Sequence, residues 1–222
     1  TTPNVTARVC PGGSVPICLP FTFAGSCGTV NCSNVTLGAP SQGTLGAPGA
    51  CPGGTPCTSG CCVVYTAPSA PTAGTATFTY TVAAGSCQST GTVTVTICLL
   101  NIQPDSGETC PDTPVTLDVT ANDSVSGTGC GTIDCHTLAV LAQPPANCGT
   151  VTVTPGCTSV SPCSSCRLIF TPALGFTGTC SFTYTVGTSV TPSCVGTGTV
   201  TVTVNPKPDA VDDLFEFDPT LP

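Results

Sequence analysis

The chain has 222 residues, of which only 6% are charged, together with 19 Cys, 25 Gly and 23 Pro. Two domains of ordinary size fit this length, while Thr, Gly or Pro interrupts every apolar stretch too early for a membrane span, and a hydrophobic fraction of 40% is too high for a disordered chain. The net charge of −8 comes from 11 acidic and only three basic residues, which leaves no basic patch for a nucleic acid.

The first repeat is predicted over residues 1–100 and is marked by alternating Thr and apolar residues in its second half. Tyr65–Val82 reads YTAPSAPTAGTATFTYTV, and a loop with one cysteine then leads into GTVTVTI, which ends at Ile97. β-Branched residues with a period of two are typical of half-buried antiparallel strands. We expect Val93, Val95 and Ile97 to face the core and the threonines between them to face water.

The second repeat is predicted over residues 101–206 and contains the same elements. Phe170–Val186 reads FTPALGFTGTCSFTYTV, which matches Tyr65–Val82, and another loop with one cysteine leads into GTVTVTV. Apolar residues spaced three and four apart never persist over the length of a helix. Short strands separated by Gly, Pro and Ser turns predict an all-β fold with two tandem antiparallel β-sandwich domains.

Residues 207–222 are expected to form a C-terminal tail that reads like the opening of a further repeat. A first strand without the rest of its sheet leaves apolar side chains without a core, and exposed strand edges attract partners. We predict that this tail adds as a strand to the sandwich of the next subunit; the alternatives are a linker or a cut in a longer protein. The apolar residues of the donated strand are Val211, Leu214, Phe215 and Phe217.

Four phrases resemble the tandem bacterial immunoglobulin-like and cadherin-like repeats of large surface proteins. They are Val119–Ser124 (VTANDS), Phe170–Val186, Gly198–Val204 (GTVTVTV) and Pro208–Asp213 (PDAVDD). The resemblance covers nearly all of the second repeat, and the first repeat mainly from Tyr65 onward. It implies immunoglobulin-like sandwiches in an extracellular stalk, adhesin or fibre. The density of cysteines departs from the usual pattern of this family, so the chain resembles a cysteine-rich variant.

Seven cysteines recur at matching places in the two repeats, and we expect them to form a disulfide framework outside the cell, in an oxidising compartment. The odd total of 19 leaves one thiol free or bonded to another chain. Cys62 is the candidate for this interchain bond, because it aligns with Arg167 just before the inward-facing Val63 and so is expected to point to solvent. Neighbouring cysteines of equivalent loops, such as Cys27 with Cys32, are candidates for local pairs. The framework consists of Cys10, Cys27, Cys32, Cys51, Cys57, Cys61 and Cys87 in the first repeat and Cys110, Cys130, Cys135, Cys157, Cys163, Cys166 and Cys194 in the second.

Metal binding is the weaker interpretation of these residues. Cys163–Cys166 (CSSC) and the Cys135-His136 pair are pieces used by zinc sites, but the first repeat has no counterpart of either. Calcium between domains is a second alternative, since acidic residues lie near the predicted domain junctions, although residues 10–98 contain no acid. Those acidic residues are Asp105, Asp123, Asp209, Asp212 and Asp213. We therefore predict no bound cofactor, with calcium as the one alternative left open.

Catalysis has little support in the sequence. Asp105-Ser106-Gly107 is similar to the motif of aspartic proteases, but no second copy supplies the carboxylate pair. A catalytic triad would depend on His136 alone, and a cysteine nucleophile would have to escape oxidation. We predict a protein that is not an enzyme.

The combined features predict the structural subunit of a secreted filament or cell-surface stalk, in which copies of the chain assemble end to end. The alternative is an adhesin-type module that binds a surface or glycan ligand. Such modules need aromatic or charged groups in a concave site, and the chain has three Tyr, no Trp and three basic residues. Attached glycans are an alternative left open, because four triplets fit the N-glycosylation pattern and matter only in a host that glycosylates; they begin at Asn4, Asn31, Asn34 and Asn122.

Overall fold

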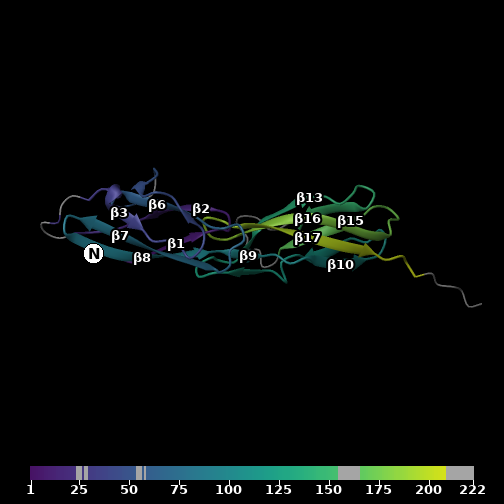
Figure 1. The fold of residues 1–222 in the computed structure, drawn as a ribbon. Helices are drawn as coiled ribbons and strands as arrows, with labels where there is room; N and C mark the ends of the chain where they lie inside the picture. Colours follow the sequence, from purple (N-terminus) through teal and green to yellow (C-terminus); the bar gives the residue numbers. More distant parts are fainter. Residues whose placement is uncertain (24–26, 28–29, 54–56, 58, 155–165, 209–222) are drawn as a thin grey trace, which may run out of the picture.

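A computed structural model describes residues 1–23, 27, 30–53, 57, 59–154 and 166–208 of the chain. These residues form two β-sandwiches that lie end to end, with the first half of the chain at one end of the molecule and the second half at the other (Figure 1). The all-β class with two tandem sandwiches, predicted from the sequence, is confirmed. Within the ranges just given, no helix has the length and apolarity needed to cross a membrane.

The described residues of the first sandwich form eight strands and one short 3₁₀ turn, η1 (Cys32–Asn34). The strands are β1 (Val5–Val9), β2 (Ser14–Cys18), β3 (Val35–Leu37), β4 (Thr44–Leu45), β5 (Gly49–Ala50), β6 (Cys61–Thr66), β7 (Thr75–Ala84) and β8 (Cys87–Ile97). One sheet has the strand order β1-β8-β7-β3, and the other has the order β2-β6-β4, with β5 also paired to β6.

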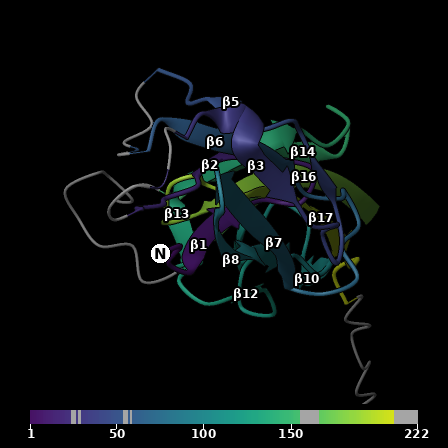
Figure 2. The same ribbon diagram turned by 60° about the vertical axis from the view of Figure 1, so that its left-hand side comes forward.

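The second sandwich repeats this arrangement. Its strands are β10 (Asp105–Thr109), β11 (Val115–Asp118), β13 (Ile133–Ala142), β14 (Gly149–Val153), β15 (Arg167–Pro172), β16 (Gly178–Thr188) and β17 (Val195–Val204). The sheet orders are β10-β17-β16-β13 and β11-β15-β14. A small ribbon of β9 (Leu99–Asn101) and β12 (Ser124–Ser126) completes this half. Figure 2 looks more nearly along the molecule and shows the strands of the first sandwich in front of those of the second.

The first strand of each sandwich pairs in parallel with the last strand. In β1 and β8, Val5 lies opposite Val93, and in β10 and β17, Asp105 lies opposite Val200. The other ladders are antiparallel, as predicted. An alternating pattern determines which face of a strand is buried but not the direction of its neighbour, so these two parallel pairs could not be read from the sequence.

The threonine-rich strands bury one face, as their period of two predicted. Val93, Val95 and Ile97 are fully buried, and the matching valines of β17 are buried too. The intervening threonines of β8 lie in partly exposed positions. Each core therefore forms between the two inner faces of a sandwich, which is the arrangement expected for packed antiparallel sheets.

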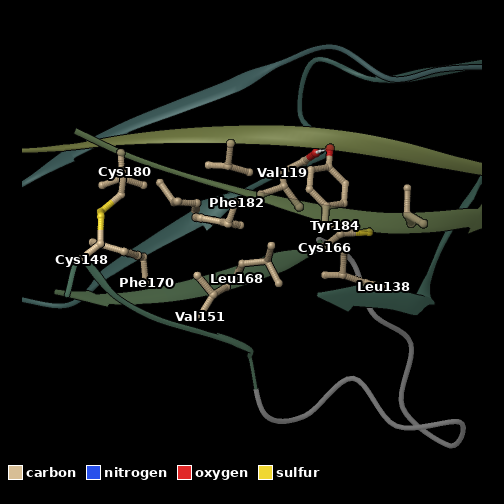
Figure 3. Packing of buried hydrophobic residues seen from close by; sticks show 14 of the residues in the cluster. Val119, Leu138, Cys148, Val151, Cys166, Leu168, Phe170, Cys180, Phe182 and Tyr184 are labelled. Carbon is tan, nitrogen blue, oxygen red and sulfur yellow. Dashed lines mark hydrogen bonds between the residues drawn. A yellow bond between two sulfur atoms is a disulfide. The ribbon is translucent and has the colours of Figure 1, made fainter. Parts of the chain in front are cut away.

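Both cores contain the same pair of stacked aromatic rings. Tyr65 stacks on Phe78 in the first sandwich, and Phe170 stacks on Phe182 in the second; the ring centroids are 6.4 Å apart in each case. Figure 3 shows Phe170 and Phe182 between the two sheets, with Leu168 close to them. The correspondence places equivalent aromatic residues at equivalent depths in the two repeats.

Each core also contains a buried tyrosine opposite a glycine of the next strand. Tyr80 lies opposite Gly91, and Tyr184 lies opposite Gly198. A Cβ atom at Gly91 would lie 2.5 Å from the Tyr80 ring, and one at Gly198 would lie 2.3 Å from the Tyr184 ring. The tyrosine ring therefore covers the glycine, and any larger residue would have to displace a fully buried ring.

Candidate functional site at the domain junction

Two disulfides join the sandwiches where they meet. Cys10, in the turn after β1, is bonded to Cys194, just before β17, across a sequence separation of 184 residues. Cys98, directly after β8, is bonded to Cys130 in the loop before β13. The Cα–Cα distance is 5.4 Å in both bridges, which is ordinary for a disulfide. The junction is therefore closed covalently at two points.

The sulfur atoms of this junction form a small core of their own. Cys98, Cys130 and Cys194 are 2%, 1% and 4% exposed, and Cys10 and Val125 pack against them. A disulfide typically stabilises a fold by about 2–4 kcal/mol, mainly by restricting the unfolded chain. The two bridges also restrict how one sandwich moves against the other, because each bonds a residue of the first half to a residue of the second.

Backbone contacts reinforce the same junction. β9 begins one residue after Cys98 and pairs with β12, so the connection between the sandwiches is itself a strand. The Arg8 guanidinium donates a hydrogen bond from Nη1 to the carbonyl oxygen of Gly129 in the other half. Gly127 and Gly129 both have positive φ angles, and a Cβ atom would lie 2.7 Å from Cys130 Sγ at the first and 2.9 Å from Arg8 Nη1 at the second. Only glycine allows the loop this close approach.

A groove with a volume of about 540 Å³ opens beside the junction, and both sandwiches contribute to its walls. Arg8 carries the only charge among its lining residues, and most of the others offer hydroxyl groups or small apolar surfaces. The groove can therefore donate and accept hydrogen bonds but has no aromatic platform. Its walls consist of Thr6, Ala7, Arg8, Val15, Thr96, Thr128, Thr191 and Pro192.

The Val119–Ser124 phrase holds the start of the second sandwich. Asp123 Oδ1 accepts a hydrogen bond from the Gln103 amide at 2.7 Å, and Asn122 Nδ2 donates one to the Pro104 carbonyl at 3.1 Å. Both bonds fix the segment that connects β9 to β10. The phrase thus positions the second sandwich relative to the junction, a role that the sequence pattern did not reveal.

The hydroxyl of Tyr184 lies between two carboxyl groups near this phrase. It donates to the Val119 carbonyl (Figure 3) and lies 3.1 Å from Asp105 Oδ2 and 3.2 Å from Asp123 Oδ2. Burial raises the pKa of Asp105 to about 6; the hydrogen bond from Tyr184 opposes this shift, and the negative charges of Asp123 and Asp118 add to it. Burial and the two carboxylates also raise the pKa of Tyr184. Asp105 is therefore partly protonated in mildly acidic solution.

The acidic residues that were considered as calcium ligands are only partly accounted for. Asp105 and Asp123 meet at Tyr184, whereas Asp209, Asp212 and Asp213 lie outside the described residues. Calcium needs roughly six to eight oxygen ligands. Calcium between the domains therefore stays an alternative to the prediction of no cofactor.

Of the cysteines considered for zinc, the two that lie in the described residues are oxidised. Cys135 is bonded to Cys166, and a disulfide sulfur is not the thiolate that binds metal. His136 Nδ1 lies 2.9 Å from Asp134 Oδ1, and this hydrogen bond lowers the pKa of Asp134. Cys163, the remaining member of the CSSC motif, lies outside the described residues.

A second group of sulfurs lies close together in the first sandwich. The Sγ atoms of Cys51, Cys57 and Cys62 are within 4.8 Å of one another. Each of them belongs to a disulfide, since Cys51 is bonded to Cys62 and Cys57 to Cys18. The group is therefore two neighbouring bridges.

The assignment of Cys62 as the unpaired or interchain cysteine is wrong. Cys62 is 3% exposed and bonded to Cys51. Strict alternation along β6 predicted a solvent-facing side chain, but the bond to Cys51, which follows the neighbouring strand β5, ties down Cys62, and Cys61, Cys62 and Val63 are all buried. In the described part of the chain, the free and exposed cysteine is Cys110.

The remaining bridges connect distant loops and strands instead of near neighbours. The local pair Cys27/Cys32 does not form, because Cys27 is bonded to Cys87 and Cys32 to Cys61. The equivalent pair in the second repeat does not form either, since its two members bond elsewhere. One further bridge, Cys148–Cys180, crosses the core of the second sandwich (Figure 3). Cys157 and the donated-strand residues Val211, Leu214, Phe215 and Phe217 lie outside the described residues.

Residues 101–205 match the family model of the bacterial Ig domain. No curated protein sequence matches the chain. Among solved structures, a tandem fragment from titin is 13% identical, with 92% of this chain and 64% of that chain covered and a TM-score of 0.41. Drosophila N-cadherin is 14% identical, with 91% and 47% covered and a TM-score of 0.28.

The structural likenesses are distant, and the chain spans less than two thirds of the length of both solved chains. TM-scores this low carry no further inference. The family match covers the second sandwich from the last residue of β9 to the end of β17. The second sandwich is thus similar to a bacterial Ig domain, within a disulfide-rich chain of tandem immunoglobulin-like repeats.

Proposed function

We propose that this chain is a structural module of a secreted, disulfide-stabilised filament or cell-surface stalk, in which immunoglobulin-like domains are joined end to end. The observation that carries the proposal is the junction, where two disulfides and a strand connection hold two sandwiches in line. A stalk must transmit force and keep its length, and bridges across each joint supply both properties. A module that only displays binding loops has no need of them.

Several further features support an extracellular structural role. The described residues contain eight disulfides, and such bonds persist in oxidising compartments outside the cell. They restrict unfolding and so protect the chain from proteases and heat. We assign the chain no enzymatic role, and its main partner in this proposal is another copy of itself.

Strand donation by residues 207–222 remains part of the proposal as a separate prediction. Apolar residues of that tail would add to the edge of a neighbouring sandwich, in the manner of strand addition. Deletion of residues 207–222 is expected to abolish assembly while leaving the two sandwiches folded. Assembly that continues after the deletion would remove strand donation but leave the end-to-end stalk intact.

Electron microscopy of the purified chain and of native material tests the proposal. We expect regular thin fibres or rods in which the two-domain unit repeats along the axis. The matched control is the same material after reduction, which opens the junction bridges and should shorten or disorder the rods. Monomers under all assembly conditions, without fibres in the native material, would contradict the proposal.

The groove beside the junction gives the adhesin alternative one specific observation. Its guanidinium and threonine hydroxyls are groups that bind sugars through hydrogen bonds. A glycan array probed with the intact chain distinguishes the two functions, with Arg8→Gln as the matched variant. Saturable binding that Arg8→Gln abolishes would favour the adhesin, whereas the stalk predicts no binding above background.

A further inference from the structure

Cys110 occupies the same place in the second sandwich that Cys10 occupies in the first. The turns Cys10–Gly13 and Cys110–Thr113 both begin Cys-Pro and follow the first strand of their domain. In both, the amide of the fourth residue donates to the carbonyl of the cysteine, at 2.9 and 3.2 Å. The third residue has a positive φ in both, 70° at Gly12 and 61° at Asp112. The two cysteines therefore lie at the same position of two turns with the same conformation.

The two turns lie at corresponding ends of their sandwiches. β1 runs parallel with β8 and β10 runs parallel with β17, so each turn lies at the end of its sandwich where the last strand finishes. For the first sandwich this end is the junction, and Cys10 is bonded there to Cys194 of the next domain. For the second sandwich the same end is the far end of the molecule, and Cys110 is exposed and unpaired in the described structure.

We propose that Cys110 forms a disulfide with an immunoglobulin-like domain stacked on the far end of the second sandwich, and so repeats the Cys10–Cys194 bond. The partner cysteine lies in the loop before the last strand of that domain, the place that Cys194 occupies here. The bond observed at the internal junction is the second, independent observation behind this assignment. The inference rests on the end-to-end assembly proposed above and names its covalent link.

The surface around Cys110 is also prepared for a neighbour. The Gly175 amide donates to Asp112 Oδ1 at 2.8 Å, which holds the β15–β16 loop against the Cys110 turn. Leu174, in the same loop, is 95% exposed. At the junction the corresponding turn also contacts the corresponding loop, but there the turn is the donor, from the Gly12 amide to the Pro68 carbonyl at 3.0 Å. A stacked domain would cover Leu174 and bury apolar surface next to the new bridge.

The stacked domain can belong to a second copy of the chain or to a further domain, and Cys110 forms a disulfide in either case. In a second copy of the chain, the cysteine that matches Cys194 is Cys87, and it is already bonded to Cys27. The Cys110 thiolate then attacks Cys87 Sγ, a Cys110–Cys87 bond forms, and Cys27 leaves as a thiolate, so no oxidant is consumed. In a further domain whose matching cysteine is a thiol, the two thiols are oxidised to a disulfide while a small disulfide such as oxidised glutathione is reduced to two thiols.

Peptide mapping under non-reducing conditions, after free thiols are blocked, tests the inference in two arms. The first arm uses the purified 222-residue chain in a buffer of reduced and oxidised glutathione. A Cys110–Cys87 peptide joining two copies would support the second copy as partner. The second arm uses the protein from its native source, where Cys110 joined to a cysteine outside these 222 residues would support a further domain. Cys110 found as a thiol, capped by glutathione, or bonded to Cys157 or Cys163 in both arms would overturn the inference.

A relocated thiol separates a placed bridge from random oxidation. Cys110→Ser should lower the amount of disulfide-linked multimers on a non-reducing gel at least tenfold. The double variant Cys110→Ser with Thr199→Cys moves the thiol to the exposed face of β17. This variant should not restore the disulfide-linked multimers. Equal cross-linking by this control would overturn the assigned position. If Cys110→Ser still forms fibres by electron microscopy, the stalk function stands and only the covalent link is lost. If the wild-type chain forms the Cys110 disulfide but no fibres, the covalent link stands and the stalk function is contradicted.

Discussion

The two sandwiches have cores of the same design but differ in the polar groups that surround them. Both contain a stacked aromatic pair and a buried tyrosine over a glycine. The Tyr80 hydroxyl lies 2.8 Å from the carbonyl oxygens of Pro3 and Pro20, whereas the Tyr184 hydroxyl meets the Val119 carbonyl and two carboxyl groups. The apolar interior has thus stayed the same, while the polar partners differ between the repeats.

The disulfides show the same contrast more strongly. Equivalent cysteines in the two repeats have different partners: Cys87 bonds within its own domain, but Cys194 bonds to the other domain. Within the part of the chain that the structure describes, Cys10 is bonded and Cys110 is not, although the same type of turn presents both. The difference teaches that position in a row of domains, and not local sequence, decides which partner a cysteine finds.

The largest expected effect separates Cys10 from Cys110. The double change Cys10→Ser with Cys194→Ser should lower the free energy of unfolding by roughly 2–4 kcal/mol, because it opens a loop of nearly the whole chain. Cys110→Ser should change it by less than about 0.5 kcal/mol, as an exposed substitution does. Guanidinium unfolding followed by circular dichroism without reductant measures both. Equal losses of stability would contradict this difference between the two cysteines in the isolated chain.

The next test compares the two glycines under the tyrosine rings. Gly198→Ala and Gly91→Ala each place a Cβ within 2.5 Å of a buried ring, and overpacking of this kind typically costs about 1–3 kcal/mol. Gly49→Ala is the matched control, because its Cβ meets no atom within 4 Å. Thermal unfolding of the three variants should place the two tyrosine-facing changes well below the control. A result in which all three melt together would contradict the close packing of the rings.

The tyrosine hydroxyls themselves should respond differently to pH. Tyr80→Phe removes a hydrogen bond to a neutral carbonyl and should cost about 1 kcal/mol at every pH from 4 to 8. Tyr184→Phe also removes the hydrogen bond that lowers the pKa of Asp105, so that pKa should rise further above 6. The loss caused by Tyr184→Phe should therefore grow as the pH increases. Carboxyl carbon shifts in NMR titrations report the pKa directly, and an unchanged value would exclude this contact.

The smallest expected effect belongs to Asp105. Its pKa is raised from 3.8 to about 6 in the fold, chiefly by burial, so the folded state binds this proton more tightly than the unfolded chain does. Its favourable contribution is therefore present below pH 4 and is lost as the pH rises through 6. Asp105→Asn should remove this decline and, after allowance for solvent screening, stabilise the fold at pH 7 by about 1 kcal/mol or less. Melting temperatures from pH 4 to 8 measure it, and an unchanged slope in the variant would refute the assignment.

The strand cores were accessible from the sequence because they depend on a local pattern. Alternation of Thr and Val predicted the buried faces of β8 and β17, and self-similarity predicted the two sandwiches. The same rule failed for Cys62, which the pattern assigned to solvent but which is buried in a disulfide with Cys51, the residue after β5. The predicted bond between Cys27 and Cys32 was also wrong, because the strands of the sandwich bring each of these cysteines next to a residue that is distant in the sequence.

The sequence by itself determined the fold class, the tandem repeat and the oxidised character of this protein, because period, composition and cysteine number act within a strand or over the whole chain. Only the tertiary structure decided the parallel edge strands, the bridge partners and the closed junction. These features depend on which loops meet when two domains stack, and contacts across 184 residues leave no local trace in the sequence.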